Sequence, residues 1–147
     1  AYEILTCDWS SDVCSSDLQN RTDVQESGHV RLSDNLSHAG YELKVMLHVA
    51  RAASKLSPMR TRVGAAVVRG GRVLGVGYNR MGTSRLSTSK WSRHAEIAAL
   101  ISAGDCRGAV LYVYREHNKT GEPLLAKPCD ACNEAIRMAG IKKVVHT

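Results

Sequence analysis

Arg93-His94-Ala95-Glu96 and Pro128-Cys129-Asp130-Ala131-Cys132 are the two stretches from which the fold and chemistry of this chain are worked out. One imidazole and two thiolates are three protein ligands for zinc. They leave the fourth tetrahedral position to water, which is typical of a catalytic rather than a structural site. Zinc lowers the pKa of such a water from about 15.7 to about 7. Glu96, two residues beyond the histidine, is the candidate general acid and base that carries the proton.

Both stretches open a segment with the pattern of a helix. Residues 94–103 form an apolar, alanine-rich run that stops at Gly104, and residues 130–139 form another that stops at Gly140. Glycine directly after such a run is a common signal for the end of a helix. We therefore predict two helices that place the zinc ligands at their N-termini, where backbone N–H groups and the helix dipole favour anionic ligands.

Each motif alone has a weaker interpretation. Cys-x-x-Cys is also half of a structural zinc site or a redox pair. A structural zinc would need a fourth protein ligand, for which Cys106, His117 and His146 are the local candidates. None of them has the usual spacing from Cys129 or Cys132, so the combined motifs favour the catalytic interpretation.

The rest of the domain alternates helices with strands. Residues 38–57 carry apolar side chains at helical spacing, with His48 on the polar face, and Pro58 ends this helix. The predicted strands are 62–69, 72–79, 109–114 and 142–146, and Gly70-Gly71 joins the first two as a hairpin. Gly75 and Gly77 indicate close packing of a helix on a strand. The pattern predicts an α/β fold with three layers, α/β/α, in which helices flank one sheet.

Taken together, the two motifs resemble the known His-x-Glu and Pro-Cys-x-x-Cys signature of the zinc-dependent cytidine and deoxycytidylate deaminase superfamily. The resemblance covers residues 38–147. It implies a cytidine-deaminase-like core with a mixed sheet, one Zn²⁺ per chain, and a homo-oligomer, dimeric or higher. It also implies a hydrolase that acts on C–N bonds in cyclic amidines. Asn79 and Ala95 stand where relatives bind substrate, although Asn79 also has the interpretation of a turn residue.

Two features depart from the family. Most members pass almost directly from the third strand into Pro-Cys-x-x-Cys, whereas here residues 115–127 intervene, with a predicted turn at Asn118-Lys119-Thr120-Gly121. We expect this insertion to be a hairpin or flap beside the metal. The sequence also stops one residue after the fourth strand, where relatives continue through another helix. This indicates either a compact variant or a truncated C-terminus.

The first 37 residues are interpreted separately. Residues 8–18 match, codon by codon, the translation of a common sequencing-adapter end, so we interpret residues 1–18 as a disordered adapter translation outside the domain. Residues 19–37 are polar and lack periodicity, which predicts a tail. Without the four acids of residues 1–18, 20 basic and 10 acidic side chains remain, and the formal net charge rises from +6 to +10.

Cysteine use and hydropathy indicate the compartment. Beyond residue 18 the cysteines are Cys106, Cys129 and Cys132, an odd number with two assigned to metal. This argues against a disulfide framework and for a reducing environment. No apolar run is long enough to span a membrane. With no secretory signal, a cytoplasmic location is the default expectation.

The charge pattern bears on the substrate. Eleven basic residues and no acid lie between Glu42 and Glu96, which favours phosphate-bearing partners. The loop before His94 holds four of these cations, and there they could bind a 5′-phosphate or a polynucleotide backbone. They are Arg80, Arg85, Lys90 and Arg93. Trp91 in the same loop is interpreted as a base-stacking or a packing residue.

These observations lead to an expected function and two alternatives. Free-nucleoside cytidine deaminases usually have cysteine at the position of His94, so the resemblance is to the nucleotide and polynucleotide branches. We expect a hydrolytic deaminase of nucleotide metabolism that removes the exocyclic amine of CMP or dCMP and releases ammonia. One alternative is a polynucleotide deaminase acting on tRNA adenosine or single-stranded DNA cytosine. The other is a non-enzymatic, zinc-stabilised nucleic-acid-binding module. The implied partner is a nucleotide or nucleic acid, with no membrane.

Overall fold

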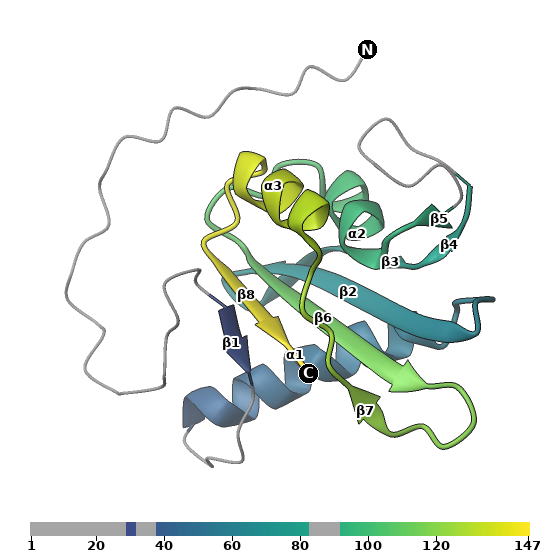
Figure 1. Cartoon of the computed structure of the whole chain (residues 1–147). Helices are drawn as coiled ribbons and strands as arrows, with labels where there is room; N and C mark the ends of the chain where they lie inside the picture. Colours follow the sequence, from purple (N-terminus) through teal and green to yellow (C-terminus); the bar gives the residue numbers. More distant parts are fainter. Residues whose placement is uncertain (1–28, 32–37, 83–91) are drawn as a thin grey trace.

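The computed structural model describes residues 29–31, 38–82 and 92–147. The segment interpreted as adapter-derived and Trp91 lie outside these residues. Figure 1 shows one sheet with helix α1 (His38–Ser54) against one face and helices α2 (Ala95–Ala103) and α3 (Asp130–Met138) against the other. The predicted three-layer α/β/α arrangement is confirmed.

The sheet is mixed and has the strand order β1-β8-β6-β2-β3, with β7 paired to β6 off this path. Its strands are β1 (His29–Arg31), β2 (Thr61–Arg69), β3 (Arg72–Tyr78), β6 (Val110–His117), β7 (Pro123–Leu124) and β8 (Lys143–His146). β2 is antiparallel to both β3 and β6, whereas β8 is parallel to β6 and to β1. The central strand β6 therefore lies between the hairpin and the C-terminal strand.

Strand β6 divides its side chains between two apolar clusters. Because successive residues of a strand point to opposite faces, Leu111 and Val113 pack with Ile97 of α2, whereas Tyr112 and Tyr114 pack against α1. Leu111 and Val113 are fully buried. Each such side chain stabilises the fold by about 1.5–3 kcal/mol relative to an exposed position, so both helix layers are held by the same strand.

The helix boundaries follow the signals in the sequence. α1 ends at Ser54, three residues before the predicted end at Ser57. Leu47 and Ala50 are buried and His48 is exposed, as predicted. α2 ends where Gly104 takes a φ of 72°, a conformation that favours glycine. None of the described helices is long and apolar enough to cross a membrane.

Two glycines of β3 set the distance between the sheet and α2. A Cβ built on Gly77 would lie 2.3 Å from the backbone nitrogen of Ala99, and one on Gly75 would lie 2.4 Å from that of Ala103. Any side chain at either position would push α2 away from the sheet. The prediction that these glycines serve close helix–strand packing is confirmed, and it matters because α2 carries His94 and Glu96 at its start.

The insertion before the second motif is a hairpin. Strand β6 continues to His117, three residues beyond the predicted end of the third strand, and the chain returns as β7. The backbone N–H of Gly121 donates to the carbonyl of His117 at 2.8 Å and closes the turn. Arg115 pairs with Leu124 across this hairpin. The expected hairpin between the third strand and Pro-Cys-x-x-Cys is confirmed.

One prediction for the N-terminal region is wrong in part. Residues 19–37 were expected to be a tail, but His29–Arg31 form β1, which pairs in parallel with β8. The unpaired backbone groups along the outer edge of β8 give a short polar segment enough hydrogen-bonding partners to form a strand without an apolar pattern. Periodicity in the segment itself could not show this.

Candidate metal centre and pocket

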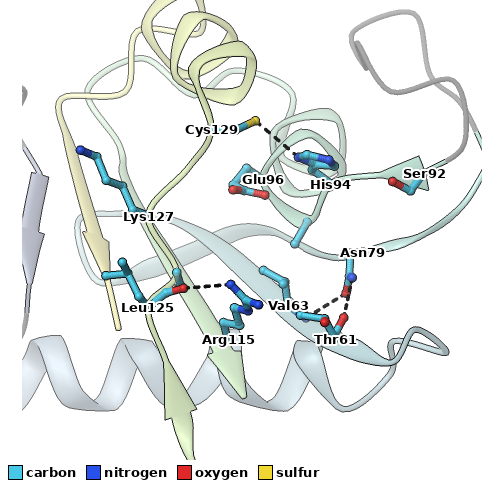
Figure 2. A pocket seen from close by; sticks show the side chains of 12 residues that line it. Thr61, Val63, Asn79, Ser92, His94, Glu96, Arg115, Leu125, Lys127 and Cys129 are labelled. Atoms are coloured by element: carbon cyan, nitrogen blue, oxygen red, sulfur yellow. Dashed lines mark hydrogen bonds between the residues drawn. The ribbon is translucent and has the colours of Figure 1, made fainter. Parts of the chain in front are cut away.

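The two helix N-termini bring the three predicted zinc ligands together. His94 is the N-cap residue of α2, Cys129 is the N-cap residue of α3, and Cys132 lies in the first turn of α3. The Nδ1 atom of His94 lies 3.6 Å from Sγ of Cys129 and 3.3 Å from Sγ of Cys132. The three ligand atoms all lie within 4.8 Å of one another. Figure 2 shows the imidazole of His94 directed at Cys129.

These distances fit a tetrahedral zinc ion. With Zn–N near 2.0–2.1 Å and Zn–S near 2.3 Å, ligand nitrogen and sulfur should be about 3.6 Å apart. In the part of the chain that the structure describes, no other His, Cys, Asp or Glu joins this group. Cys106, one of the candidates for a fourth ligand, instead directs its buried thiol at the carbonyls of Leu100 and Gly104. The three-ligand arrangement is the one expected of a catalytic zinc.

The surroundings of Cys132 show what metal binding must change. Its side chain is buried, and burial raises the pKa of the thiol well above its usual range, with further contributions from nearby Glu96 and Cys129. Zinc binds thiolates, so binding must release this proton. The N-termini of α2 and α3 favour negative charge at the same place.

Glu96 lies beside the ligands in the first turn of α2. It is 5% exposed and lines the pocket. Burial raises the pKa of its carboxyl, although its own backbone N–H and the neighbouring His94 act in the opposite direction. A carboxyl whose pKa is shifted upward, towards neutrality, is suited to both accepting and donating a proton. The candidate proton carrier therefore has the environment that this role needs.

The pocket in front of these residues has a volume of about 250 Å³. This is near the lower end of the range for small-molecule sites, roughly 300–1,000 Å³, and so suits a single small ligand. Its walls come from β2, the residue after β3, Ser92 of β5 (Ser92–Arg93), the start of α2, Arg115 of β6 and the segment that joins β7 to α3 (Figure 2). The lining residues are Thr61, Val63, Asn79, Ser92, His94, Ala95, Glu96, Arg115, Leu125, Ala126, Lys127 and Cys129.

Both predicted substrate-binding residues line this pocket. Ala95 is fully buried at the first position of α2. The side chain of Asn79 accepts a hydrogen bond from the backbone N–H of Val63 at 2.8 Å and donates one to the carbonyl of Thr61 at 2.7 Å. An amide has two donor hydrogens and two acceptor lone pairs. Asn79 therefore clamps the start of β2 and retains one donor and one lone pair for a ligand.

The cations of the pocket differ from those expected. Arg80 is exposed on β4 (Arg80–Met81), 6.0 Å from the centre of the Tyr78 ring, and Arg93 is its cross-strand neighbour on β5 (Ser92–Arg93). Arg85 and Lys90 lie outside the described residues. Among the described residues, the Lys and Arg side chains that line the pocket are Arg115 and Lys127, which we did not select from the sequence. Extending the alternation of Leu111 and Val113 by one more step would have placed Arg115 on the pocket face.

Comparisons with known proteins agree with the geometry. Residues 40–147 match the family described as the cytidine and deoxycytidylate deaminase zinc-binding region. The deoxycytidylate deaminase of Mycobacterium phage D29 is 34% identical over 125 residues, which cover 68% of this chain and 89% of that protein. The crystal structure of dCMP deaminase from the cyanophage S-TIM5 in apo form has a TM-score of 0.54 and 27% identity, with 71% of this chain and 83% of that chain covered.

A further relative is much longer than this chain. The riboflavin biosynthesis protein RibD of Aquifex aeolicus is 32% identical over 110 residues. The match covers 70% of this chain but 26% of RibD, so the chain spans about a quarter of that protein. The similarity concerns one part of RibD and not the whole protein.

Proposed function

This chain belongs to the zinc-binding family of cytidine and deoxycytidylate deaminases, and on that premise we propose that its substrate is a cytosine nucleotide, CMP or dCMP. The chain is a zinc-dependent hydrolytic deaminase. One observation carries the substrate proposal. A pocket for one small ligand is lined by the zinc ligands His94 and Cys129 and by the buried Glu96, and the third ligand, Cys132, lies next to these two ligands. The chain is 34% identical to a deoxycytidylate deaminase.

His94, Cys129 and Cys132 would hold the zinc, which when bound supplies a water of lowered pKa at neutral pH. Glu96 accepts the proton that this water loses as its oxygen adds to C4 of the cytosine ring. The same carboxyl gives this proton to the ring nitrogen N3, then takes the second proton of the added water from the hydroxyl on C4 and gives it to the exocyclic amine. The C4–N bond breaks, ammonia leaves, and C4 keeps the oxygen as a carbonyl, so that cytosine and water become uracil and ammonia.

The remaining walls of the pocket would position the ring for this attack. The backbone N–H of Ala95 is one of the first four in α2, which have no acceptor within the helix, and it is placed to donate to a ring carbonyl. Val63 offers an apolar surface to one face of the base, and Asn79 retains a donor and an acceptor for the sugar. Correct alignment of reacting groups contributes greatly to rate, so these contacts would affect turnover as well as affinity.

The partial match to RibD supports a second candidate substrate, an intermediate of riboflavin biosynthesis. A polynucleotide is the third candidate substrate. Deamination of each of these substrates would use the same zinc ligands and Glu96, so the substrates differ only in the groups that fill the rest of the pocket. The zinc ligands and Glu96 therefore do not distinguish between them.

Ammonia release from a substrate panel tests the proposal. The panel contains CMP, dCMP, cytidine, deoxycytidine, riboflavin-pathway pyrimidines, tRNA stem-loops with adenosine, and single-stranded oligonucleotides. We expect the highest kcat/KM with CMP or dCMP, and ammonia release about 10²–10⁴-fold slower from the Glu96→Gln variant with the same substrate. Ammonia release from another member of the panel with none from CMP or dCMP would contradict it.

A further inference from the structure

Arg115 is a cation that the fold places inside the pocket. It pairs with Val63 on β2 and with Leu124 on β7, and therefore sits where the central strand meets the inserted hairpin. The alternation along β6 puts Arg115 on the face of Val113, towards the pocket, and Glu116 on the face of α1. Two strands fix its backbone, so its position does not depend on a flexible loop.

Within residues 29–31, 38–82 and 92–147, the guanidinium of Arg115 has no negative partner. One terminal nitrogen donates to the carbonyl of Leu125 at 3.4 Å. The Nε atom is buried and has no hydrogen-bond acceptor in the part of the chain that the structure describes. Among the described residues no carboxylate lies within 4.0 Å of this guanidinium, whereas Arg51 has Glu116 and Arg69 has Asp105 at such distances. A guanidinium has five N–H donors and is always charged, so Arg115 retains both charge and donors for a ligand.

The place of Arg115 in the pocket indicates which part of a ligand it would meet. Figure 2 shows it between Leu125 and Val63, on the side of the pocket away from Cys129 and His94. A cytosine ring whose amine faces the metal ligands would extend its sugar and 5′-phosphate away from them. Lys127 is a weaker candidate, because its side chain is exposed and is directed away from both Arg115 and Glu96 in the same view.

We propose that Arg115 binds the 5′-phosphate of the substrate and is the residue by which this pocket distinguishes a nucleotide from a nucleoside. The inference rests on the proposed function. A phosphate supplies the negative charge that the guanidinium lacks, and paired N–H donors match its oxygens. If Arg115 instead bound the neutral carbonyl of the base, the positive charge of its guanidinium would stay uncompensated. Because Arg115 borders the insertion that departs from the family pattern, this selection would be a property of the hairpin.

The test compares two substrates in three variants of the full chain. Arg115→Gln removes the charge, Arg115→Lys keeps it without the planar fork, and Lys119→Gln makes the same charge change at the exposed turn of the hairpin. We expect Arg115→Gln to lower kcat/KM for dCMP by about 10- to 100-fold, mainly through KM, given the strength of charged hydrogen bonds. Deoxycytidine should change less than about threefold, Arg115→Lys should restore part of the loss, and Lys119→Gln should match the wild type.

Binding measurements separate this inference from the proposed function. Calorimetry with dUMP and deoxyuridine, and with AMP and adenosine, reports preference for the phosphate without turnover. If dCMP is not deaminated but a monophosphate binds more tightly than its nucleoside, and Arg115→Gln removes that difference, the proposed function fails and this inference stands. A wild type with no preference for the monophosphate would overturn the inference. So would an equal loss for dCMP and deoxycytidine in Arg115→Gln, with an unchanged melting temperature.

Discussion

The two faces of the sheet each hold a buried glutamate, and the two differ in their partners. On the face that α1 covers, the side chain of Glu116 is 4% exposed and its carboxylate lies 3.5 Å from Nε of Arg51. On the opposite face, the similarly buried Glu96 has no ion-pair partner among the described residues. The contact with Arg51 lacks hydrogen-bond geometry and acts through charge alone. Arg51 also lies 5.7 Å from the centre of the Tyr114 ring. Burial raises the pKa of this tyrosine, and the nearby guanidinium acts in the opposite direction.

The two faces therefore use buried charge differently. A buried ionised group is costly unless it is paired, and the α1 face meets that requirement within the protein. The pocket face leaves a glutamate and an arginine for a ligand to complete. Burial raises the pKa of the glutamate, Glu96, and carboxyls with a shifted pKa concentrate at functional sites. Arg115 and Glu116 are neighbours in the chain yet belong to these two different environments. Changes on one face should affect catalysis, and changes on the other should affect stability.

The largest effect is expected from removing the metal ligands of the pocket face. Cys129→Ala/Cys132→Ala should contain no zinc and show no measurable turnover, because one histidine does not hold the ion. Elemental analysis measures the zinc content, and ammonia release measures turnover. A chelator should not change the melting temperature of the double variant, whereas it should lower that of the wild type. Cys106→Ser, at the buried cysteine outside the group, should keep zinc, and stoichiometric zinc in the double variant would refute the ligand assignment.

Glu96→Gln should separate chemistry from folding on the same face. Removing the proton carrier should lower kcat by about 10²–10⁴-fold. Zinc content and melting temperature should stay near those of the wild type, because the amide fills the same space without a buried charge. Glu134→Gln on the exposed side of α3 is the matched control and should be fully active. A kcat for Glu96→Gln within a few-fold of the wild type would rule out the assigned role.

Arg51→Met tests the α1 face. It leaves the buried Glu116 without its ion-pair partner and should cost about 1–2 kcal/mol in the free energy of unfolding. The cost is moderated because the Arg51 side chain is 40% exposed and Arg62 lies across the strand from Glu116. Urea unfolding measures this loss of stability. The kcat/KM of Arg51→Met should stay within about twofold of the wild-type value. Arg107→Met, which removes an exposed pair with Asp105, should leave the free energy of unfolding unchanged within the error of the measurement.

Deleting residues 1–18 should have the smallest effect, because their sequence indicates that they belong to neither face. The apolar residues in this segment follow no helical or strand period. The melting temperature should change by less than about 2 °C, and turnover should be unaffected. A larger loss of stability would show that the segment is part of the protein and not translated adapter.

The metal motifs and most of the elements were predictable because they rest on local patterns. Gly104 marks the end of α2, Gly70-Gly71 joins the hairpin, and the spacing of Leu47 and Ala50 defines the buried side of α1. The role of Asn79 was only half visible, since its hydrogen bonds to Thr61 and Val63 depend on strand pairing. The strand at His29–Arg31 was not visible at all, because its partner lies at the other end of the chain.

The sequence by itself determined the zinc chemistry, because a histidine and two cysteines on two helix starts specify a metal whatever surrounds them. Only the tertiary structure decided which charges face the ligand. Whether Arg115 or Glu116 enters the pocket depends on the register of β6 against β2 and β7, and a slip of one residue would exchange them. That register is set by contacts among residues far apart in the chain. The pocket cation therefore became identifiable only once the sheet was in place.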